Sequence, residues 1–306
     1  LLLVGTALLL NGAPRARRIT KVVDAYPMPS PDGSRIVFQS NRTGNFELYT
    51  AKADGSDMVQ LTRTPYDEST PAWSPDGRLL AYAAEPDGNS DAFVMNADGT
   101  GVRRLTDHPG DDSHPHWSPD GSRILFNSAR TTPDLNAPWA RQWHEVFSIR
   151  PDGNDLRQLT NCKILCTYAV MSPDGKKIVY RKLTNDPGFS WELTSIPRNS
   201  EIFVANVDGS EEMNISRSAG FDGWPTWSPD GRWILFSSNR NGPALIGQLF
   251  VVRPEGTDLR QFTFGMESLV QPSWSADGKQ IYAAQYSTDE ETASVVVLDV
   301  SKTLEP

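Results

Sequence analysis

The stretch Ser30-Pro31-Asp32-Gly33 decides the fold, because it returns at regular intervals along the chain. Four further copies and one variant, Ser-Ala-Asp-Gly, begin at Ser74, Ser118, Ser172, Ser228 and, for the variant, Ser275. Successive copies start 44, 44, 54, 56 and 47 residues apart, which is the spacing of β-propeller blades and not of heptads or helical solenoids. Six copies of one unit predict one repeat architecture rather than several domains.

Each copy has the composition of a hairpin turn, because Pro presets the backbone for a turn and Gly accepts a positive φ. An apolar segment such as Pro71-Ala72-Trp73 precedes the turn and an alternating run such as residues 79–83 follows it, which predicts two strands, a and b. A third strand, c, leads to a second Gly turn. An apolar residue followed by Thr or Ser, as in Leu61-Thr62, marks strand d. The repeat is therefore a four-stranded antiparallel blade.

The spacing of the two turns distinguishes the two faces of the predicted ring. The second-turn Gly precedes the next blade's Ser by 19 residues in all five cases, whereas the distance between the two turns of a blade varies from 22 to 34 residues. In an up-and-down blade the a–b and c–d turns share one face, here called the turn face. The b–c and d–a loops share the other, the loop face. The length variation falls on the loop face, where we expect the binding site.

The sixth blade ends after its third strand, at residues 294–300, and no second turn follows. Near the N-terminus, Ile19-Thr20 reads like the end of a strand d and precedes Ser30 by 11 residues, against 13 in the other blades. We therefore expect the N-terminal strand to close blade six. The predicted fold is all-β: a single six-bladed propeller of four-stranded antiparallel blades over residues 17–300, with an apolar segment at 1–16 and a tail at 301–306.

The Ser-Pro-Asp-Gly turns, the Trp before them, as at Trp73 and Trp117, and the later Asp-Gly…Leu-Thr pattern resemble the repeats of the TolB-like six-bladed propeller family. The resemblance covers residues 17–300, and we expect no counterpart of the helical N-terminal domain of TolB. It implies the fold but not an activity, because the family is functionally mixed and some relatives are metal-dependent sugar-acid lyases.

Composition and the N-terminal residues restrict the class of partner and indicate where the protein acts. A net charge of −9 and a pI near 5.0 argue against nucleic acid, which needs a clustered basic surface. The first ten residues are an apolar run that is too short to span a bilayer and resembles part of an export signal. We expect an extracytoplasmic protein that contacts the membrane through residues 1–16, as a retained anchor, a buried docking segment or a signal remnant.

The two cysteines, Cys162 and Cys166, lie four residues apart in the loop entering blade four. Export would permit a disulfide, but the spacing does not show whether the geometry allows one, so a bonded pair and two free thiols both stay open. Two ligands are too few for a metal site.

Carboxylates recur at the entry of strand a, six residues before the first-turn Ser. They are Asp24, Glu68, Asp112 and Asp222. Because strand a is innermost in a propeller, these side chains would converge on the channel mouth and offer oxygen ligands to Ca²⁺. The alternative is that each carboxylate caps its own loop, which is the commoner role. We expect no cofactor to be required.

All four histidines belong to blade three or the loop entering it: His108, His114, His116 and His144. On a regular strand His114 and His116 would point the same way, and with Asp112 they would form a transition-metal site. Three arginines at equivalent positions after strand b, Arg42, Arg130 and Arg240, are better explained by structural ion pairs than by an anionic partner.

We expect the Trp before the first turn, as at Trp73, to pack between adjacent sheets. Four other tryptophans fall in the b–c insertions or a d–a loop and are expected on the loop face. They are Trp139, Trp143, Trp191 and Trp224. With Arg141 they have the composition of a protein-interaction hot spot, although long insertions also need small cores of their own. We therefore predict a non-catalytic scaffold or accessory subunit that binds a protein partner in the cell envelope or a membrane complex. The alternative is a metal-dependent lyase or hydrolase with a His-rich site in blade three.

Overall fold

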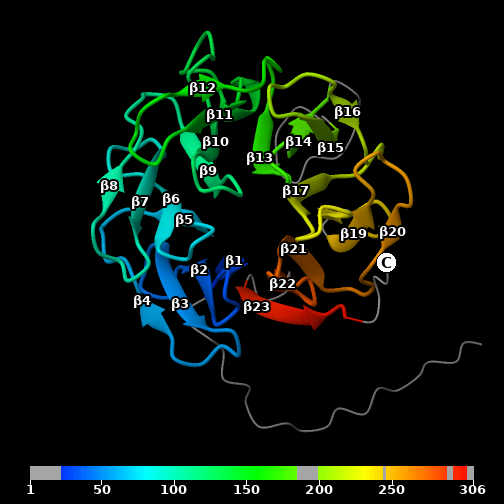
Figure 1. The fold of residues 1–306 in the computed structure, drawn as a ribbon, viewed down its shortest axis with the longest axis horizontal. Coiled ribbons are helices and arrows are strands. Elements are labelled where there is room, and N and C mark those ends of the chain that lie inside the picture. Colours follow the sequence, from blue (N-terminus) through cyan, green and yellow to red (C-terminus); the bar gives the residue numbers. More distant parts are fainter. Residues whose placement is uncertain (1–21, 185–198, 244–245, 288–291, 302–306) are drawn as a thin grey trace, which may run out of the picture.

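The structure is a computed structural model that describes residues 22–184, 199–243, 246–287 and 292–301. Six antiparallel sheets surround a central axis in sequence order, one for each repeat (Figure 1). Five sheets have four strands, and the sixth has three within the described residues. The prediction of a six-bladed all-β propeller is confirmed.

Blades one to three comprise β1 (Asp24–Pro29), β2 (Arg35–Ser40), β3 (Glu47–Lys52), β4 (Val59–Gln60); β5 (Glu68–Trp73), β6 (Leu79–Ala84), β7 (Asp91–Asn96), β8 (Arg103–Arg104); β9 (Asp112–Trp117), β10 (Ile124–Ser128), β11 (Glu145–Ile149) and β12 (Arg157–Gln158). Blades four to six comprise β13 (Cys166–Met171), β14 (Lys177–Leu183), β15 (Ser200–Asn206), β16 (Met213–Asn214); β17 (Asp222–Trp227), β18 (Ile234–Ser238), β19 (Gln248–Val252), β20 (Arg260–Gln261); β21 (Ser268–Trp274), β22 (Gln280–Ser287) and β23 (Thr292–Asp299). In the described part of the chain, the one helix is a short 3₁₀ turn, η1 (Trp139–Arg141), between β10 and β11. It is far too short to cross a membrane, and the described residues contain no helix that could do so.

The Ser-Pro-Asp-Gly turns form as predicted, and Ser and Asp hold each of them. In blade one the Ser30 hydroxyl donates to Asp32 Oδ1 at 2.6 Å and accepts a hydrogen bond from the Arg35 amide at 3.0 Å. Gly33 has φ +70°, a left-handed conformation that favours glycine. In blade one β4 ends at Gln60, so Leu61-Thr62, which marks strand d in the sequence, directly follows the strand. Its hydrogen bonding continues past β4, because the Leu48 amide donates to Thr62 Oγ1 at 2.8 Å.

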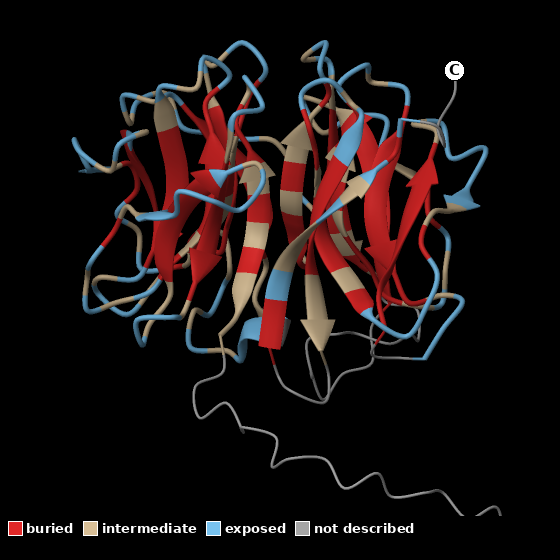
Figure 2. Ribbon diagram, turned by 90° about the horizontal axis from the view of Figure 1, so that it is seen from below, coloured by how far each residue is buried: buried red, intermediate tan, exposed pale blue. Residues whose placement is uncertain are grey.

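Tryptophans connect neighbouring blades. Trp73 Nε1 donates to the Met28 carbonyl of blade one at 3.2 Å, and Trp117 Nε1 donates to the Ala72 carbonyl of blade two at 3.2 Å. Trp73 and Trp117 are 6% and 4% exposed, so each also fills the space between two sheets. Figure 2 shows the resulting distribution, with buried strands in the middle and exposed loops on both faces.

Blades six and one meet at the entry of the first strand. Val23 forms a parallel bridge with Ala293 of β23, and equivalent bridges join His144 to Leu165 and Ser200 to Phe221 at two other junctions. Val23 thus occupies the position that, at those two junctions, belongs to the segment linking strand d of one blade to strand a of the next. The predicted closing segment, Ile19-Thr20, lies outside the described residues, as do the apolar segment 1–16 and residues 302–306 of the tail.

Candidate functional site

A β-bulge interrupts the innermost strand of every blade at the same place. In β1 the pairing with β2 shifts between Ala25 and Met28, and the first of the two residues between them, Tyr26, has φ +51°. The equivalent residues of all six blades share this left-handed conformation: Tyr26, Thr70, His114, Tyr168, Trp224 and Gln271. None is glycine, and side chains other than glycine, Asn and Asp rarely adopt this conformation. Backbone strain of this kind is concentrated at functional sites.

Proline accounts for most of these bulges. The residue after the bulged one is Pro in five blades, as at Pro27 and Pro71, and Ala169 in blade four. Proline has no amide hydrogen to donate to a strand ladder, so within sheets it is confined to edges and bulges. Strand a is the inner edge of each blade, which satisfies this restriction. The bulge turns the preceding side chain toward the central channel.

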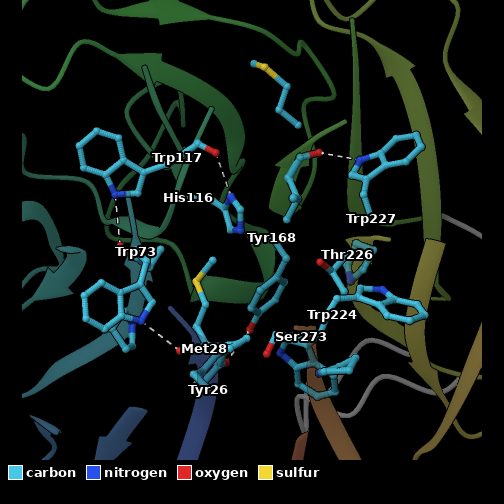
Figure 3. A pocket seen from close by; sticks show the side chains of 18 of the residues that line it. Tyr26, Met28, Trp73, His116, Trp117, Tyr168, Trp224, Thr226, Trp227 and Ser273 are labelled. Atoms are coloured by element: carbon cyan, nitrogen blue, oxygen red, sulfur yellow. Dashed lines mark hydrogen bonds between the residues drawn. The ribbon is translucent and has the colours of Figure 1, made fainter. Parts of the chain in front are cut away.

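The bulged residues meet on the axis and form a floor across the channel. Tyr26 Oη and Tyr168 Oη, from blades one and four, lie 3.2 Å apart (Figure 3). The ring centroid of His114 lies 3.9 Å from that of Tyr168, and the Trp224 ring lies 6.0 Å from it. The Tyr26 amide donates to Gln271 Oε1 at 3.1 Å. Side chains from five blades therefore converge at one level of the channel.

A cavity of about 420 Å³ lies on the turn-face side of this floor. Its lining begins at the bulged residues and continues to the first turns, as at Pro31 and Pro75, and no lining residue precedes a bulge. We call this cavity the cup. Its volume falls within the roughly 300–1,000 Å³ typical of ligand pockets. The cup opens on the turn face, opposite to the face on which we expected the site.

The cup carries no formal charge, although the chain as a whole is acidic. None of its 34 lining residues is Asp, Glu, Lys or Arg, and eleven are prolines. Burial, with the nearby Arg181 guanidinium adding to it, lowers the pKa of His114 to about 3, and burial also lowers the pKa of His116. Both imidazoles are therefore neutral at neutral pH. An apolar occupant fits this lining better than an ionic one.

The four predicted carboxylates are held by their own blades. Arg42 binds Asp24 at 2.8 Å, and the Arg130–Asp112 and Arg240–Asp222 pairs are each 2.7 Å long. The arginines also lie over aromatic rings of the same blade; Arg240, for example, is 5.4 Å from the centroid of Phe236. The structural ion pairs predicted for the three arginines are confirmed. A calcium site at these carboxylates stays a prediction, and three of its four candidate ligands already bind a cation.

Glu68, the fourth carboxylate, is buried beside Glu47. Its Oε1 accepts a hydrogen bond from Thr64 Oγ1 at 2.6 Å, while Oε2 of Glu68 and Oε2 of Glu47 are both buried without a donor. Burial raises the pKa of Glu68 to about 8, and the neighbouring Glu47 contributes to the rise. The pair therefore holds a proton at neutral pH.

Two of the four histidines lie together. His114 and His116 both line the cup, and their Nδ1 atoms lie 3.0 Å from Asn127 Oδ1 and 3.1 Å from the Trp117 carbonyl oxygen, respectively. Asp112, the expected third ligand, bonds to Arg130 instead. Among the described residues, the one group of three potential ligands within 4.8 Å is Glu145, Cys162 and Cys166. Its two cysteines form a disulfide, which answers the question that the spacing left open.

The residues predicted to bind a partner do not all lie on the loop face. Trp139 and Arg141, in η1, are exposed on the loop face, and Trp143 follows them half-buried. The prediction for Trp224 is wrong. It was expected in a loop of that face, but it lies within β17 and lines the cup. It does so because the bulge in β17 directs it inward. Trp191 lies outside the described residues.

Sequence reasoning missed the floor of the cup, although a signal for it was present. The position four residues before each first-turn Ser is never glycine, and a proline follows it in five of six blades. Proline at a repeated position inside a strand was the signal for a bulge, because within sheets proline is confined to edges and bulges.

Comparisons with known proteins agree with this architecture. Residues 48–192 match the family described as the tricorn protease N-terminal beta propeller domain, and residues 193–305 match the TolB beta propeller domain. A solved structure described as putative TolB from Agrobacterium tumefaciens superposes with a TM-score of 0.65 over 91% of each chain at 23% identity, which shows a shared fold.

Two curated relatives match over part of the chain. The uncharacterized peptidase YuxL of Bacillus subtilis strain 168 is 33% identical over 110 residues, which cover 36% of this chain and 16% of that protein. The Tol-Pal system protein TolB of Francisella tularensis subsp. mediasiatica is 28% identical over 134 residues, which cover 40% of this chain and 30% of that protein. The chain thus spans less than a third of the length of either relative.

Proposed function

Because the chain is a TolB-like six-bladed β-propeller, we propose that it is a non-catalytic interaction subunit that acts outside the cytoplasm and receives an apolar segment of an envelope protein in its cup. The observation that carries this proposal is the uncharged, proline-rich cup, closed at its floor by the Tyr26–Tyr168 pair. A relative that is named a Tol-Pal system protein supports a partner in the cell envelope.

The energetics favour insertion of a side chain into the cup. An aromatic residue buries roughly 200 Å², and at about 25 cal/mol per Å² this burial would contribute about 5 kcal/mol before the ordering costs of binding. The cup needs little reorganisation, because the bulges and the hydrogen bonds of the floor already fix its lining. A preformed apolar socket of this kind suits a partner's aromatic or aliphatic anchor.

The metal-dependent lyase has less support. A lyase site needs metal ligands that converge. Asp112 binds Arg130 and does not line the cup, whereas His114 and His116 do. Elemental analysis of the purified protein tests it directly: a tightly held Mn, Fe or Zn that is lost on replacing His114 and His116 would favour the lyase over the scaffold.

The scaffold is tested by filling the cup. Thr226 lies half-buried in β17 within the cup, whereas Thr257 is exposed in a c–d turn on the same face outside it. We expect Thr226→Trp to abolish co-purification of the partner from gently solubilised native membranes, and Thr257→Trp to leave it intact. Both variants should show wild-type circular dichroism. Equal recovery with both variants would contradict the proposal.

A further inference from the structure

A second cavity lies on the loop face, between blades three and four. It has a volume of about 420 Å³. Its lining comes from the end of the β10–β11 insertion, the loop that enters β13, and the end of β14, with Phe203 of β15 beside them. The b–c and d–a loops lie opposite the first turns, so this cavity and the cup open on opposite faces. We call it the basic cleft, after its charge.

The lining of the basic cleft is positively charged, although the chain as a whole is acidic. Three of its ten lining residues are cationic, Arg141, Lys163 and Lys182, and none is acidic, although the chain carries a net charge of −9. Lys182 is bound to Glu212 at 2.5 Å. Arg141 and Lys163 are exposed, and within the described residues neither side chain forms an ion pair or a hydrogen bond. Two cations are therefore available to an anionic ligand.

The backbone that carries these cations is held in place. The Glu145 carboxylate accepts hydrogen bonds from Thr160 Oγ1 and from the amides of Cys162 and Lys163, at 2.7, 2.8 and 2.6 Å. The Cys162–Cys166 disulfide closes the same loop. A fixed backbone lowers the ordering cost of binding.

The insertion that carries Arg141 is closed at its base. Thr132 Oγ1 donates to the Trp143 carbonyl at 2.8 Å and accepts a hydrogen bond from the Trp143 amide at 2.7 Å. Trp143 and Phe203 give the cleft an aromatic wall beside its cations. The lining thus combines fixed positive charge with an apolar surface.

We propose that the basic cleft binds an acidic peptide segment of a partner protein. Its carboxylates would pair with Arg141 and Lys163, and an apolar side chain between them would pack on Trp143. A guanidinium binds a carboxylate through two parallel hydrogen bonds, and Trp and Arg are the residues most enriched at interaction hot spots. This proposal does not depend on the cup. With both sites, the propeller holds two partners of different chemistry on its opposite faces.

The test uses a fluorescein-labelled peptide of alternating Glu and Phe, with the matched Gln/Phe peptide as a neutral control. Anisotropy is measured with the wild-type chain, with Arg141→Gln/Lys163→Gln, and with Arg78→Gln/Lys279→Gln, which removes the same charge from exposed first turns. We expect the cleft variant to lose at least tenfold in affinity for the acidic peptide, and the control variant to bind as the wild type does. Binding should weaken with added salt.

Three outcomes would overturn this inference. The acidic peptide does not bind the wild-type chain; or it binds both double variants equally; or the Gln/Phe peptide binds as tightly as the acidic one. Trigalacturonate is measured alongside. If this acidic saccharide bound more tightly than the peptide, and lost its affinity in the cleft variant, the cleft would be assigned to an anionic carbohydrate instead.

Discussion

Tyr26 and Tyr168 meet at 3.2 Å through their hydroxyl groups, although they come from blades one and four, which face each other across the ring. The contact is possible because each residue is the left-handed member of a bulge, with φ +51° and +57°. It divides the central channel and gives the cup its floor. The chemistry at the floor of the cup therefore depends on the side chains at the bulged position of strand a.

The hydrogen bond across the channel should be measurable as a coupling. Tyr26→Phe and Tyr168→Phe should each lower the free energy of unfolding by about 1 kcal/mol, the typical net value of one hydrogen bond. The double variant should cost little more than either single variant, because both changes remove the same bond. Chemical denaturation of the four proteins measures this, and fully additive losses would show that the hydroxyls do not interact.

The repeated Arg–Asp pairs should contribute to stability according to their burial. Asp222 is fully buried against Arg240, whereas the Asp24 side chain is 20% exposed against Arg42. We expect Asp222→Asn to cost about 3 kcal/mol, because it leaves a buried guanidinium uncompensated. Asp24→Asn should cost about 1 kcal/mol or less.

Denaturation with and without added Ca²⁺ completes that comparison. The ion-pair account predicts that both losses are the same in calcium and in chelator. A loss at Asp222 that appears only when calcium is present would instead assign these carboxylates to a metal site.

Glu68 should make the protein less stable as the pH rises. Its pKa is raised from 4.5 to about 8 by burial and then by Glu47, so the folded protein holds a proton that the unfolded chain has released. The stabilisation is complete below about pH 4.5 and is lost as the pH rises toward 8. Glu68→Gln should therefore flatten the fall in melting temperature between pH 5 and pH 8. Melting curves at several pH values check this, and an unchanged slope would argue against the buried proton.

The sequence predicted the ring well because the ring is built from local signals. Asp32 and Gly33 belong to a turn whose hydrogen bonds close within six residues, and the same turn returns at every blade. Trp73 and Trp117 pack between sheets as their repeated position indicated. The Arg–Asp pairs were also predictable, because a repeated residue in a repeated loop most often supports the repeat.

The site was less predictable, because it depends on breaks in the regular strand. A regular strand was assumed for His114 and His116, whereas β9 has a bulge after Ser113; Trp224 was assigned to a loop, whereas it lies in β17 directly after Gly223, where that strand bulges. Trp224 consequently points into the channel instead of lying on the loop face. The meeting of Tyr26 with Tyr168 joins residues 142 positions apart, which only closure of the ring brings together.

The central claim is that the cup receives an apolar segment of a partner. The most direct measurement places the photo-reactive residue p-benzoylphenylalanine at position 226, within the cup, and at position 257, on the same face outside it, followed by irradiation of native membranes and sequencing of the cross-linked peptides. The account predicts one partner peptide with an apolar or aromatic residue at the cross-link, obtained from position 226 and absent from position 257. Cross-links that are the same from both positions, or that reach only charged segments, would contradict it.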